Sequence, residues 1–326
     1  MSYFLDIPEQ IKISLTNICN YKCKMCPNQL LKQKRGFITD DLVYRILDEC
    51  AELGVKSISL GGTGEPLMHK KLIEYLARAK SYGFYVSTTS NCSLMNKEIA
   101  EKLLSEKLDR LCISIYSSDN KSHQNYTGTD SFTQASENII YFLKSWKERK
   151  SEMLVNMWFL SIPGINDQRE FLNFWQPIAN EVGLQLTIKQ PINWGGRVEI
   201  YGEDISKKKI FVRKNETNYE IVNKQSIRCE HVRNYLFVLH DGTVVPCCNI
   251  QESDPEGKIV FGNLNNEKII DIWKGEKFLA FKNAHYKKKI QQYPLCRDCS
   301  EVIAEITWQL SLGHYIEKAK NRLLAK

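Results

Sequence analysis

Along residues 11–190, short runs of β-branched and other apolar residues alternate with stretches whose apolar residues recur every three or four positions. Such runs predict buried strands, and the stretches between them predict amphipathic helices. The clearest helix is expected over 39–53, after a Thr39-Asp40 cap signal, with further helical faces around Leu72, Leu103 and Trp175. The expected strands are IKISLT (11–16), SISLGG (57–62), FYVSTTS (84–90), RLCISI (110–115), LVNMWFL (154–160) and LQLTIKQ (184–190).

Strand and helix follow each other six times, which predicts an α/β fold with parallel strands joined by right-handed crossovers. Six units are fewer than the eight of a closed barrel of this kind. An open, partial (β/α)6 barrel is therefore the first expectation, and an ordinary doubly wound sheet is the second. In either architecture, ligand-binding residues are expected in loops at the carboxyl ends of the strands.

The pattern changes near residue 193, where NWGGRVEIYGEDISKKK is Gly-rich and polar, as linkers often are. We expect the barrel over 1–200 and a linker over 201–225. A small cysteine-rich α+β domain is expected over 226–300, followed by a C-terminal helix over 301–326.

Composition and charge exclude several classes of protein. The first residues lack the basic start and apolar run of a signal peptide, and no stretch approaches the roughly 18 uncharged apolar residues of a membrane span. The net charge of +7, from 45 Lys and Arg against 38 Asp and Glu, is modest for 326 residues and indicates no nucleic-acid track. The sequence predicts a soluble cytoplasmic protein with no membrane or nucleic-acid partner.

Eleven cysteines are unusual for such a chain. Without an export signal, clustered cysteines indicate metal binding or chemistry more often than disulfides. Cys50, Cys92 and Cys112 stand singly among apolar residues and are expected in the core. The other eight form two groups, which are Cys19, Cys23 and Cys26 near the start, and Cys229, Cys247, Cys248, Cys296 and Cys299 further on.

The stretch CNYKCKMC (19–26) places three cysteines at x3 and x2 spacing in the loop after the first expected strand. A zinc knuckle is one interpretation, but structural zinc takes four ligands, and no fourth cysteine lies in this loop. Iron–sulfur cubes normally use one cysteine per iron. A cube held by three cysteines would keep one iron open for another molecule.

This motif after the first strand of a (β/α)6 pattern resembles that of the radical S-adenosylmethionine (radical SAM) superfamily. Met25 replaces the aromatic-type residue that the family has before the third cysteine, a small departure. The resemblance implies that Cys19, Cys23 and Cys26 hold a [4Fe–4S] cluster whose open iron binds the amino and carboxylate groups of S-adenosylmethionine (SAM). The reduced cluster breaks the C–S bond of SAM, and the resulting 5′-deoxyadenosyl radical takes a hydrogen atom from substrate.

Residues after the later strands fit the same family. GGTGE (61–65) resembles its Gly-Gly-Glu segment, which contacts the SAM amino group; glycine permits close backbone approach and a carboxylate suits an ammonium. PGIN (163–166) roughly matches the segment near adenine, without the full glycine pattern. For the serine and asparagine positions the alternative is ordinary turn chemistry, and for the lysine a surface position. The residues expected to bind SAM are Gly61, Gly62, Thr63, Gly64, Glu65, Ser90, Asn91, Ser114 and Lys189.

The second cysteine group also follows a known order. HDGTVVPCC, then FGNL, DIW and a CxxC pair resemble the SPASM module, an auxiliary-cluster extension behind many radical SAM domains. The resemblance implies one auxiliary [4Fe–4S] cluster held by Cys229, Cys247, Cys296 and Cys299, with zinc at the same thiolates as the alternative. Adjacent residues of an extended chain point oppositely, so Cys248 is expected not to share this cluster. It is either a buried thiol or a catalytic hydrogen-atom donor, as in radical SAM epimerases.

The resemblance implies oxidation (dehydrogenation) or epimerisation of a substrate, with an external electron donor such as flavodoxin or ferredoxin. Because the first strand is expected by about residue 11, no fused leader-binding domain is expected. This favours a small substrate such as a sugar, an aminocyclitol or a nucleotide-linked metabolite, and a sugar or aminocyclitol is the first expectation. The alternatives are a peptide- or protein-modifying maturase and an activator of a glycyl-radical enzyme. A zinc-stabilised binding protein without catalysis is the alternative of another class.

Overall fold

The computed structural model of the protein describes residues 5–162, 164–189, 191–194, 197–198, 210–213, 219–222, 229, 231–250, 259–287, 289–297 and 299. The helix expected over 301–326 lies outside the described residues, as does most of the expected linker. None of the helices within the described ranges has the length and apolar character needed to span a bilayer.

Six parallel strands form the main part of the sheet, in the order of the sequence. Five of them lie within the runs expected for them, and β1 begins one residue before its run, at Gln10, so the α/β class and the six parallel strands are confirmed. The strands are β1 (Gln10–Ile13), β2 (Ser57–Leu60), β3 (Tyr85–Ser90), β4 (Arg110–Ser114), β5 (Leu154–Leu160) and β6 (Leu186–Lys189).

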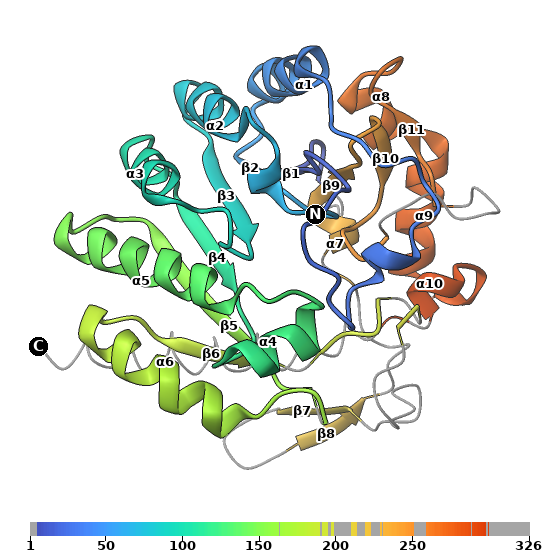
Figure 1. Ribbon diagram of the computed structural model, residues 1–326. Coiled ribbons are helices and arrows are strands. Elements are labelled where there is room, and N and C mark those ends of the chain that lie inside the picture. Colours follow the sequence, from blue (N-terminus) through green and yellow to red (C-terminus); the bar gives the residue numbers. More distant parts are fainter. Residues whose placement is uncertain are drawn as a thin grey trace, which may run out of the picture.

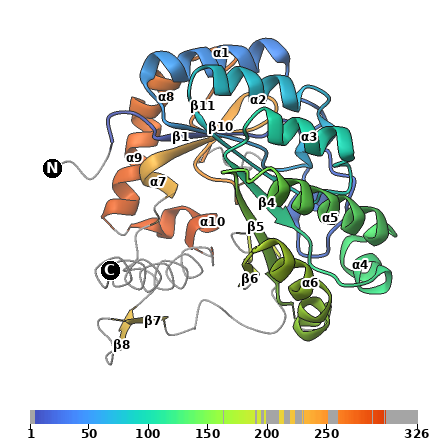
Figure 2. The same ribbon diagram turned by 90° about the vertical axis from the view of Figure 1, so that its left-hand side faces the viewer.

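Helices cover one face of this sheet, which we call the outer face, and the sheet curves away from them (Figures 1 and 2). The expected helix over 39–53 begins one residue later, at Asp40. The helix α4 is an addition between β4 and the next helix. The helices of this part are α1 (Asp40–Leu53), α2 (Leu72–Ser81), α3 (Lys97–Ser105), α4 (Asn120–Thr127), α5 (Phe132–Glu148) and α6 (Gln168–Val182).

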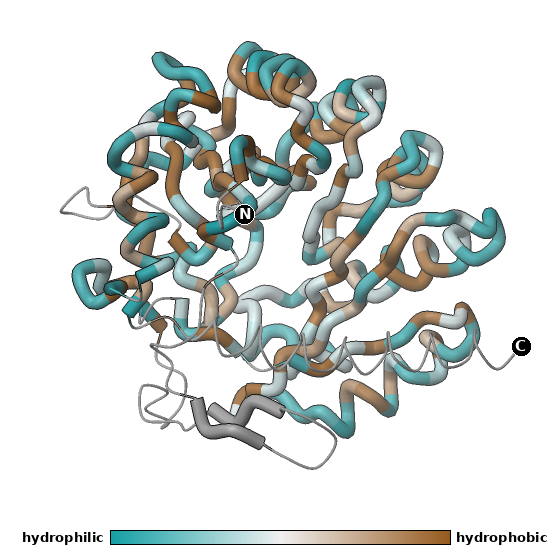
Figure 3. The backbone as a smooth tube through the Cα atoms, turned by 180° about the vertical axis from the view of Figure 1, so that it is seen from behind, coloured by the Kyte–Doolittle hydropathy of each residue, from teal (hydrophilic) through white to brown (hydrophobic). Residues whose placement is uncertain are grey.

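The two faces of the sheet differ in polarity. Residues paired across neighbouring parallel strands point to the same side, so the register sorts the side chains. The outer face is apolar and at most 1 % exposed at Ile11, Ile58, Val86, Ile113 and Met157. On the other face, which we call the inner face, the pairs Cys112 with Asn156 and Ser114 with Trp158 lie beside Thr187 and Lys189. Figure 3 shows the matching alternation of hydrophobic and hydrophilic residues along the covering helices.

The cysteine-rich region continues the same sheet. Its first strand, β9 (Tyr235–Val238), pairs in parallel with β1, and β10 (Thr243–Val245) and β11 (Gly262–Asn263) follow in antiparallel order. A separate antiparallel pair, β7 (Ile210–Arg213) and β8 (Tyr219–Val222), lies within the expected linker. The helices here are α7 (His231–Asn234), α8 (Ile269–Lys274), α9 (Glu276–Tyr286) and α10 (Pro294–Arg297).

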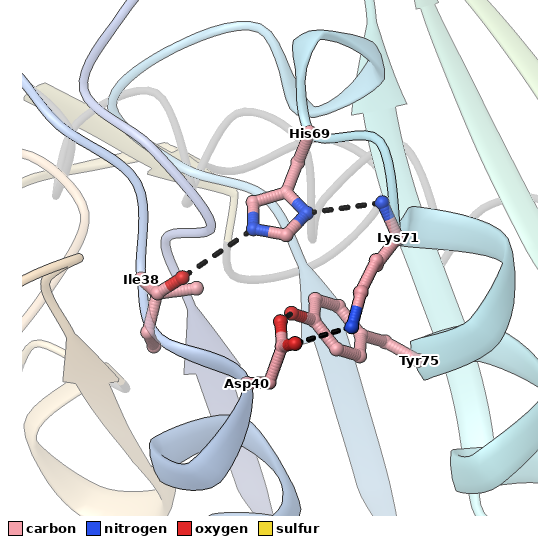
Figure 4. Close-up of polar contacts among 5 residues, drawn as sticks. All are labelled: Ile38, Asp40, His69, Lys71 and Tyr75. Carbon is pink, nitrogen blue, oxygen red and sulfur yellow. Dashed lines mark hydrogen bonds and ion pairs between the residues drawn. The ribbon is translucent and has the colours of Figure 1, made fainter.

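A polar network joins the start of α1 to the start of α2 (Figure 4). Asp40 accepts hydrogen bonds from Lys71 and, at 2.5 Å, from the Tyr75 hydroxyl. The hydrogen bond from Lys71 holds the pKa of Asp40 below its usual value. Thr39 occupies the N-cap position but its side chain makes no capping bond, and Asp40 and Asp41 place acidic groups in the first turn of the helix. His69 contacts the Ile38 carbonyl at 3.4 Å, which fixes the turn after residue 65.

Candidate functional site

The cysteine loop, residues 14–39, connects β1 to α1 and carries Cys19, Cys23 and Cys26. All three are free, partly buried thiols, and a turn closed by the Cys26 amide on the Cys23 carbonyl (2.9 Å) brings two of them together. Burial raises the pKa of Cys19 to about 12, and burial raises the pKa of Cys23 and Cys26 as well. The neighbouring thiols raise the pKa of Cys19 and Cys23 further, because thiolates at close range repel one another.

This donor set fits a thiolate-bound metal cluster. Buried thiols near one another ionise only with difficulty, and bound iron would supply the positive charge that makes thiolates favourable. Within the described ranges, no group of three or more His, Cys, Asp or Glu residues is placed to hold a single metal ion. In a cube each cysteine binds a different iron, so that finding concerns mononuclear sites such as zinc.

A network of amides and one guanidinium fixes the cysteine loop at both ends. The Arg35 guanidinium donates to the carbonyls of Asn17 and Asn28, each at 2.6 Å. The Asn28 side chain in turn donates to the carbonyl of Thr63 at 2.6 Å. The positive charge of Arg35 also lowers the pKa of Cys19 and Cys26, in opposition to the effect of burial. Sequence reasoning missed these residues because no spacing or motif marks them.

The middle of the cysteine loop is held by α4. The Lys22 amide donates to the Thr127 carbonyl (2.8 Å), and the Lys24 amide donates to the Tyr126 carbonyl (3.0 Å). The Tyr21 hydroxyl lies 3.2 Å from Nε2 of His123 and accepts a hydrogen bond from Ser131 at 3.0 Å. These buried contacts fix the side chain of Tyr21, which lies between Cys19 and Cys23 in the sequence.

His123 should make folding stability depend on pH. It is 1 % exposed and its Nδ1 lies 2.7 Å from the Ser117 hydroxyl, and burial lowers its pKa from 6.5 to about 4, against the opposing charges of Asp119 and Asp130. Below pH 6.5 the imidazole of His123 therefore binds a proton in the unfolded chain but stays neutral in the folded chain. The free energy of unfolding consequently falls as the pH falls towards 4. Between pH 7 and 5 we expect a loss of about 2 kcal/mol from this residue. Urea denaturation at both pH values should show that loss of unfolding free energy, and the loss should be smaller in His123→Gln. An equal loss in both proteins would show that His123 is not the group responsible.

The GGTGE segment lies against the cysteine loop. A Cβ added to Gly64 would lie 2.2 Å from the Ile18 carbonyl oxygen, and the Glu65 amide donates to that oxygen at 3.0 Å. A Cβ on Gly62 would lie 2.5 Å from the Phe237 ring of β9, and Gly61 has a φ of 145°, which side chains rarely adopt. The glycines therefore permit close packing of protein on protein, whereas close approach of a ligand was the reason expected.

Glu65 connects several of the expected SAM-binding residues through hydrogen bonds. Its buried carboxylate accepts hydrogen bonds from the Ser90 hydroxyl (2.7 Å), the Asn91 amide (2.9 Å) and the Leu67 amide (3.0 Å). Burial raises the pKa of Glu65, and these three donors oppose that effect. Ser114 donates to the Ser90 carbonyl at 3.1 Å.

The expected SAM-binding residues also contact the cysteine loop. The Asn91 side chain donates to Asn20 at 3.0 Å, and Glu65 contributes to the raised pKa of Cys19. Thr63 is also close, since its hydroxyl lies 2.6 Å from that of Ser14. The structure thus brings together all the expected SAM-binding residues except Lys189, whose ammonium lies over the Trp158 ring at 3.4 Å from the centroid.

An apolar patch lies beside the cysteines. Met25, Tyr126, Ile162 and Ile165 are buried together, each at most 8 % exposed, and Cys23 packs against them. Met25 is the residue that departs from the family pattern, and Ile165 belongs to the PGIN stretch. Pro163 of that stretch lies outside the described residues.

The second group of cysteines also converges. Burial raises the pKa of Cys247, and the nearby thiols of Cys248, Cys229, Cys296 and Cys299 raise it further, in that order. The Cys248 sulfur lies 3.7 Å from the hydroxyl of Tyr235, a buried residue on the inner face of β9. The three cysteines expected in the core are all buried: Cys50 and Cys92 belong to the main core cluster, and Cys112, 5 % exposed, lies on the inner face of β4.

Comparison with known proteins decides the family. Residues 13–174 match the sequence model of the radical SAM superfamily, and residues 229–300 match that of the SPASM iron–sulfur cluster-binding domain. This chain belongs to the radical SAM superfamily. Both resemblances are thereby confirmed, and so are the cofactors: radical SAM enzymes with a SPASM domain use SAM and [4Fe–4S] clusters, including an auxiliary cluster.

Several curated relatives of this radical SAM protein are named as probable GTP 3′,8-cyclases. A probable GTP 3′,8-cyclase of Pyrococcus horikoshii is 32 % identical over 157 residues, which are 48 % of each chain. The chain thus spans about half the length of the first curated relatives it matches. A probable GTP 3′,8-cyclase of Saccharolobus islandicus is 24 % identical over 82 % of this chain and 88 % of its own.

Solved structures share the fold. BtrN in complex with AdoMet and 2-DOIA is 16 % identical, with a TM-score of 0.57 over 90 % of this chain and 93 % of its own. SuiB of Streptococcus suis, bound to its precursor peptide SuiA, is 15 % identical, with a TM-score of 0.64 over 86 % of this chain and 67 % of its own. These likenesses agree with the open barrel and its cysteine-rich extension.

Proposed function

We propose that this radical SAM enzyme takes a hydrogen atom from a small sugar or aminocyclitol substrate and thereby oxidises or epimerises it. One observation carries the proposal: three partly buried free thiols lie in a loop that contacts Glu65 and Asn91 at the carboxyl edge of the sheet. When bound, the cluster and SAM supply one-electron C–S cleavage and a 5′-deoxyadenosyl radical.

The chain's own residues would hold and orient these groups. Cys19, Cys23 and Cys26 would ligate the cluster, and the backbone of residues 61–65 would receive the SAM amino group. Ser90, Asn91 and Ser114 form a connected polar group beside it, since they bond to Glu65 or to one another. The apolar patch of Met25 and its neighbours offers a surface for the adenine ring beside Cys23.

The auxiliary cluster would be held by Cys229, Cys247, Cys296 and Cys299; the thiols of the other three all raise the pKa of Cys247. The substrate would lie against the inner face, where Ser114, Asn156 and Thr187 offer hydroxyl and amide groups. Such groups suit a ligand rich in oxygen, as sugars and aminocyclitols are. An external electron donor such as flavodoxin or ferredoxin would supply the electron.

Cyclisation of a purine nucleoside triphosphate is a second candidate, favoured by the 32 % identity to a probable GTP 3′,8-cyclase. Peptide modification is a third, because SuiB, which shares the fold, was solved with a precursor peptide. The test is anaerobic reaction of the reconstituted protein with SAM, reductant and deuterated sugars, aminocyclitols, GTP or peptides. We expect deuterium in 5′-deoxyadenosine from a sugar or aminocyclitol; transfer from GTP or a peptide alone would contradict the proposal.

Cys248 remains the candidate hydrogen-atom donor, and its contact with the Tyr235 hydroxyl keeps it on the inner-face side of β9. Its thiol would give a hydrogen atom to the substrate radical, and the thiyl radical left behind would then take one electron from the external donor and one proton. We expect Cys248→Ala to lower the ratio of product to 5′-deoxyadenosine by at least about tenfold. The ratio is measured by chromatography of quenched reactions, and an unchanged ratio would assign Cys248 to packing alone.

A further inference from the structure

The cysteine loop carries positive charge on its exposed residues, which the SAM site does not explain. Residues 10–39 contain no aspartate or glutamate, and residues 14–39 contain five lysines and arginines. Four of these cations are exposed and form no ion pair within the part of the chain that the structure describes, namely Lys22, Lys24, Lys34 and Arg35. Lys24 and Arg35 donate to amide and carbonyl oxygens, which are neutral and leave the positive charge unbalanced. Such a surface attracts a negatively charged partner.

The cations lie beside the expected cluster ligands. Lys22 and Lys24 are the two sequence neighbours of Cys23. From the other end of the loop, the charge of Arg35 lowers the pKa of Cys26, so the guanidinium is close enough to act on that thiol. The positive surface is therefore next to the thiols of this loop.

Two large apolar residues are exposed in the same loop. Leu30 is 56 % exposed and Phe37 is 46 % exposed. Leu30 ends the short helix η1 (Pro27–Leu30), and Arg35 bonds to this helix at the Asn28 carbonyl (2.6 Å) and the Asn28 side chain (2.9 Å). Exposed apolar groups among charged ones are typical of protein interfaces. We call Lys22, Lys24, Leu30, Lys34, Arg35 and Phe37 the basic surface.

The second group of cysteines lies at the other edge of the sheet. Since β9 is parallel to β1 and β10 runs back antiparallel, Cys247 and Cys248, which follow β10, lie at the amino edge. The cysteine loop follows the carboxyl end of β1 and contacts α4. Figure 2 shows α4 on the side of the molecule opposite to α9 and α10. A partner on the basic surface is thus near the N-terminal cysteines and away from the second group.

We propose that the basic surface docks a small acidic protein that carries single electrons. Electron transfer between two proteins requires close approach of their redox centres, and this surface lies beside the thiols expected to hold the N-terminal cluster. In the docked pair the reduced carrier loses one electron and the oxidised cluster gains it, with no atom transferred. The inference rests on the function proposed above and adds the place where its external electron donor binds.

The test is calorimetric binding of oxidised flavodoxin, an acidic one-electron carrier, to the full-length, anaerobically reconstituted protein at low ionic strength. Lys22→Glu and Lys34→Glu should each weaken binding about tenfold, because an attraction becomes a repulsion. The effect should shrink as salt is added, since exposed charges are screened. The matched control is Lys56→Glu, the same change at an exposed lysine just before β2, at the amino edge, which should bind as the unaltered protein does.

Leu30→Ser tests the apolar part of the basic surface. We expect it to weaken flavodoxin binding about fivefold, because less apolar surface is removed from water in the complex. Unlike the effect of the lysine variants, this one should persist at high salt, since apolar burial is not screened as charge is.

Three results would overturn the inference. They are no flavodoxin binding at low ionic strength, binding by Lys22→Glu and Lys34→Glu that equals binding by Lys56→Glu, or a DNA oligonucleotide that binds more tightly than flavodoxin and is weakened by the same two variants. Thermal unfolding shows whether each variant folds, and either lysine variant alone is sufficient.

The unaltered protein is also assayed for 5′-deoxyadenosine with reduced methyl viologen, a small reductant that needs no protein docking surface. If no 5′-deoxyadenosine forms, the proposed function fails. If it forms while flavodoxin does not bind, only the docking surface fails.

Discussion

Replacing Cys19, Cys23 or Cys26 with alanine is expected to lower 5′-deoxyadenosine formation by at least about a thousandfold. Removal of an outer-shell partner of a metal ligand already costs about 10–100-fold, and loss of the ligand itself costs more. Each of these thiols is partly buried and lies near at least one other of the group, so an alanine would leave one iron without its protein ligand. Iron content should fall from about eight to about four per chain, which leaves the auxiliary cluster.

Cys50→Ala is the matched control. It makes the same chemical change at a fully buried cysteine of α1 that packs in the main core. This variant should lose some stability but keep its iron and its SAM cleavage. Iron and sulfide analysis, together with chromatography of 5′-deoxyadenosine, compares Cys50→Ala with the alanine variants of the motif cysteines. Full iron content in one of those variants would exclude that cysteine as a cluster ligand.

Gly64→Ala should have the second largest effect. The added Cβ would lie 2.2 Å from the Ile18 carbonyl oxygen and 2.7 Å from that of Thr16. Both neighbours are backbone of the cysteine loop and cannot rotate away, so the loop itself has to shift. Overpacking of this kind costs about 1–3 kcal/mol, and we expect a value near the upper end, about 3 kcal/mol. The shifted loop should also bind less iron, because its cysteines move with it.

Gly36→Ala tests whether the loss is specific to this contact. Gly36 lies in the same loop, but a Cβ there would meet only the His240 side chain at 3.5 Å, an ordinary contact. Urea denaturation and iron analysis of both variants measure the difference. Equal stability of the two variants would show that residues 61–65 do not fix the cysteine loop.

The sequence was sufficient to predict the six strands, because local runs of apolar residues alternate with helical periodicity. It also identified both cysteine groups, because the spacing of Cys19, Cys23 and Cys26 within one loop is a local property. Expected SAM-binding residues lie together around Glu65, as the rule that ligands gather at the carboxyl ends of parallel strands requires.

Long-range pairing was not predictable from the same signals. No local pattern shows that β9 pairs with β1, more than two hundred residues earlier in the chain, so the cysteine-rich region was expected as a separate small domain. The hub of Tyr21 and His123 was missed for a similar reason, since its residues lie 102 positions apart. The Arg35 network likewise depends on backbone carbonyls, whose positions follow from the fold alone.

Electron–nuclear double resonance on the reduced protein with labelled SAM tests the central claim most directly. If one iron of the N-terminal cluster is left open by its three cysteines, ¹⁵N in the SAM amino group and ¹⁷O in its carboxylate should both couple to the cluster spin. The signal should persist in Cys50→Ala and vanish in Cys23→Ala. Absence of both couplings in the unaltered, iron-loaded protein, or zinc bound at Cys19, Cys23 and Cys26, would contradict the claim.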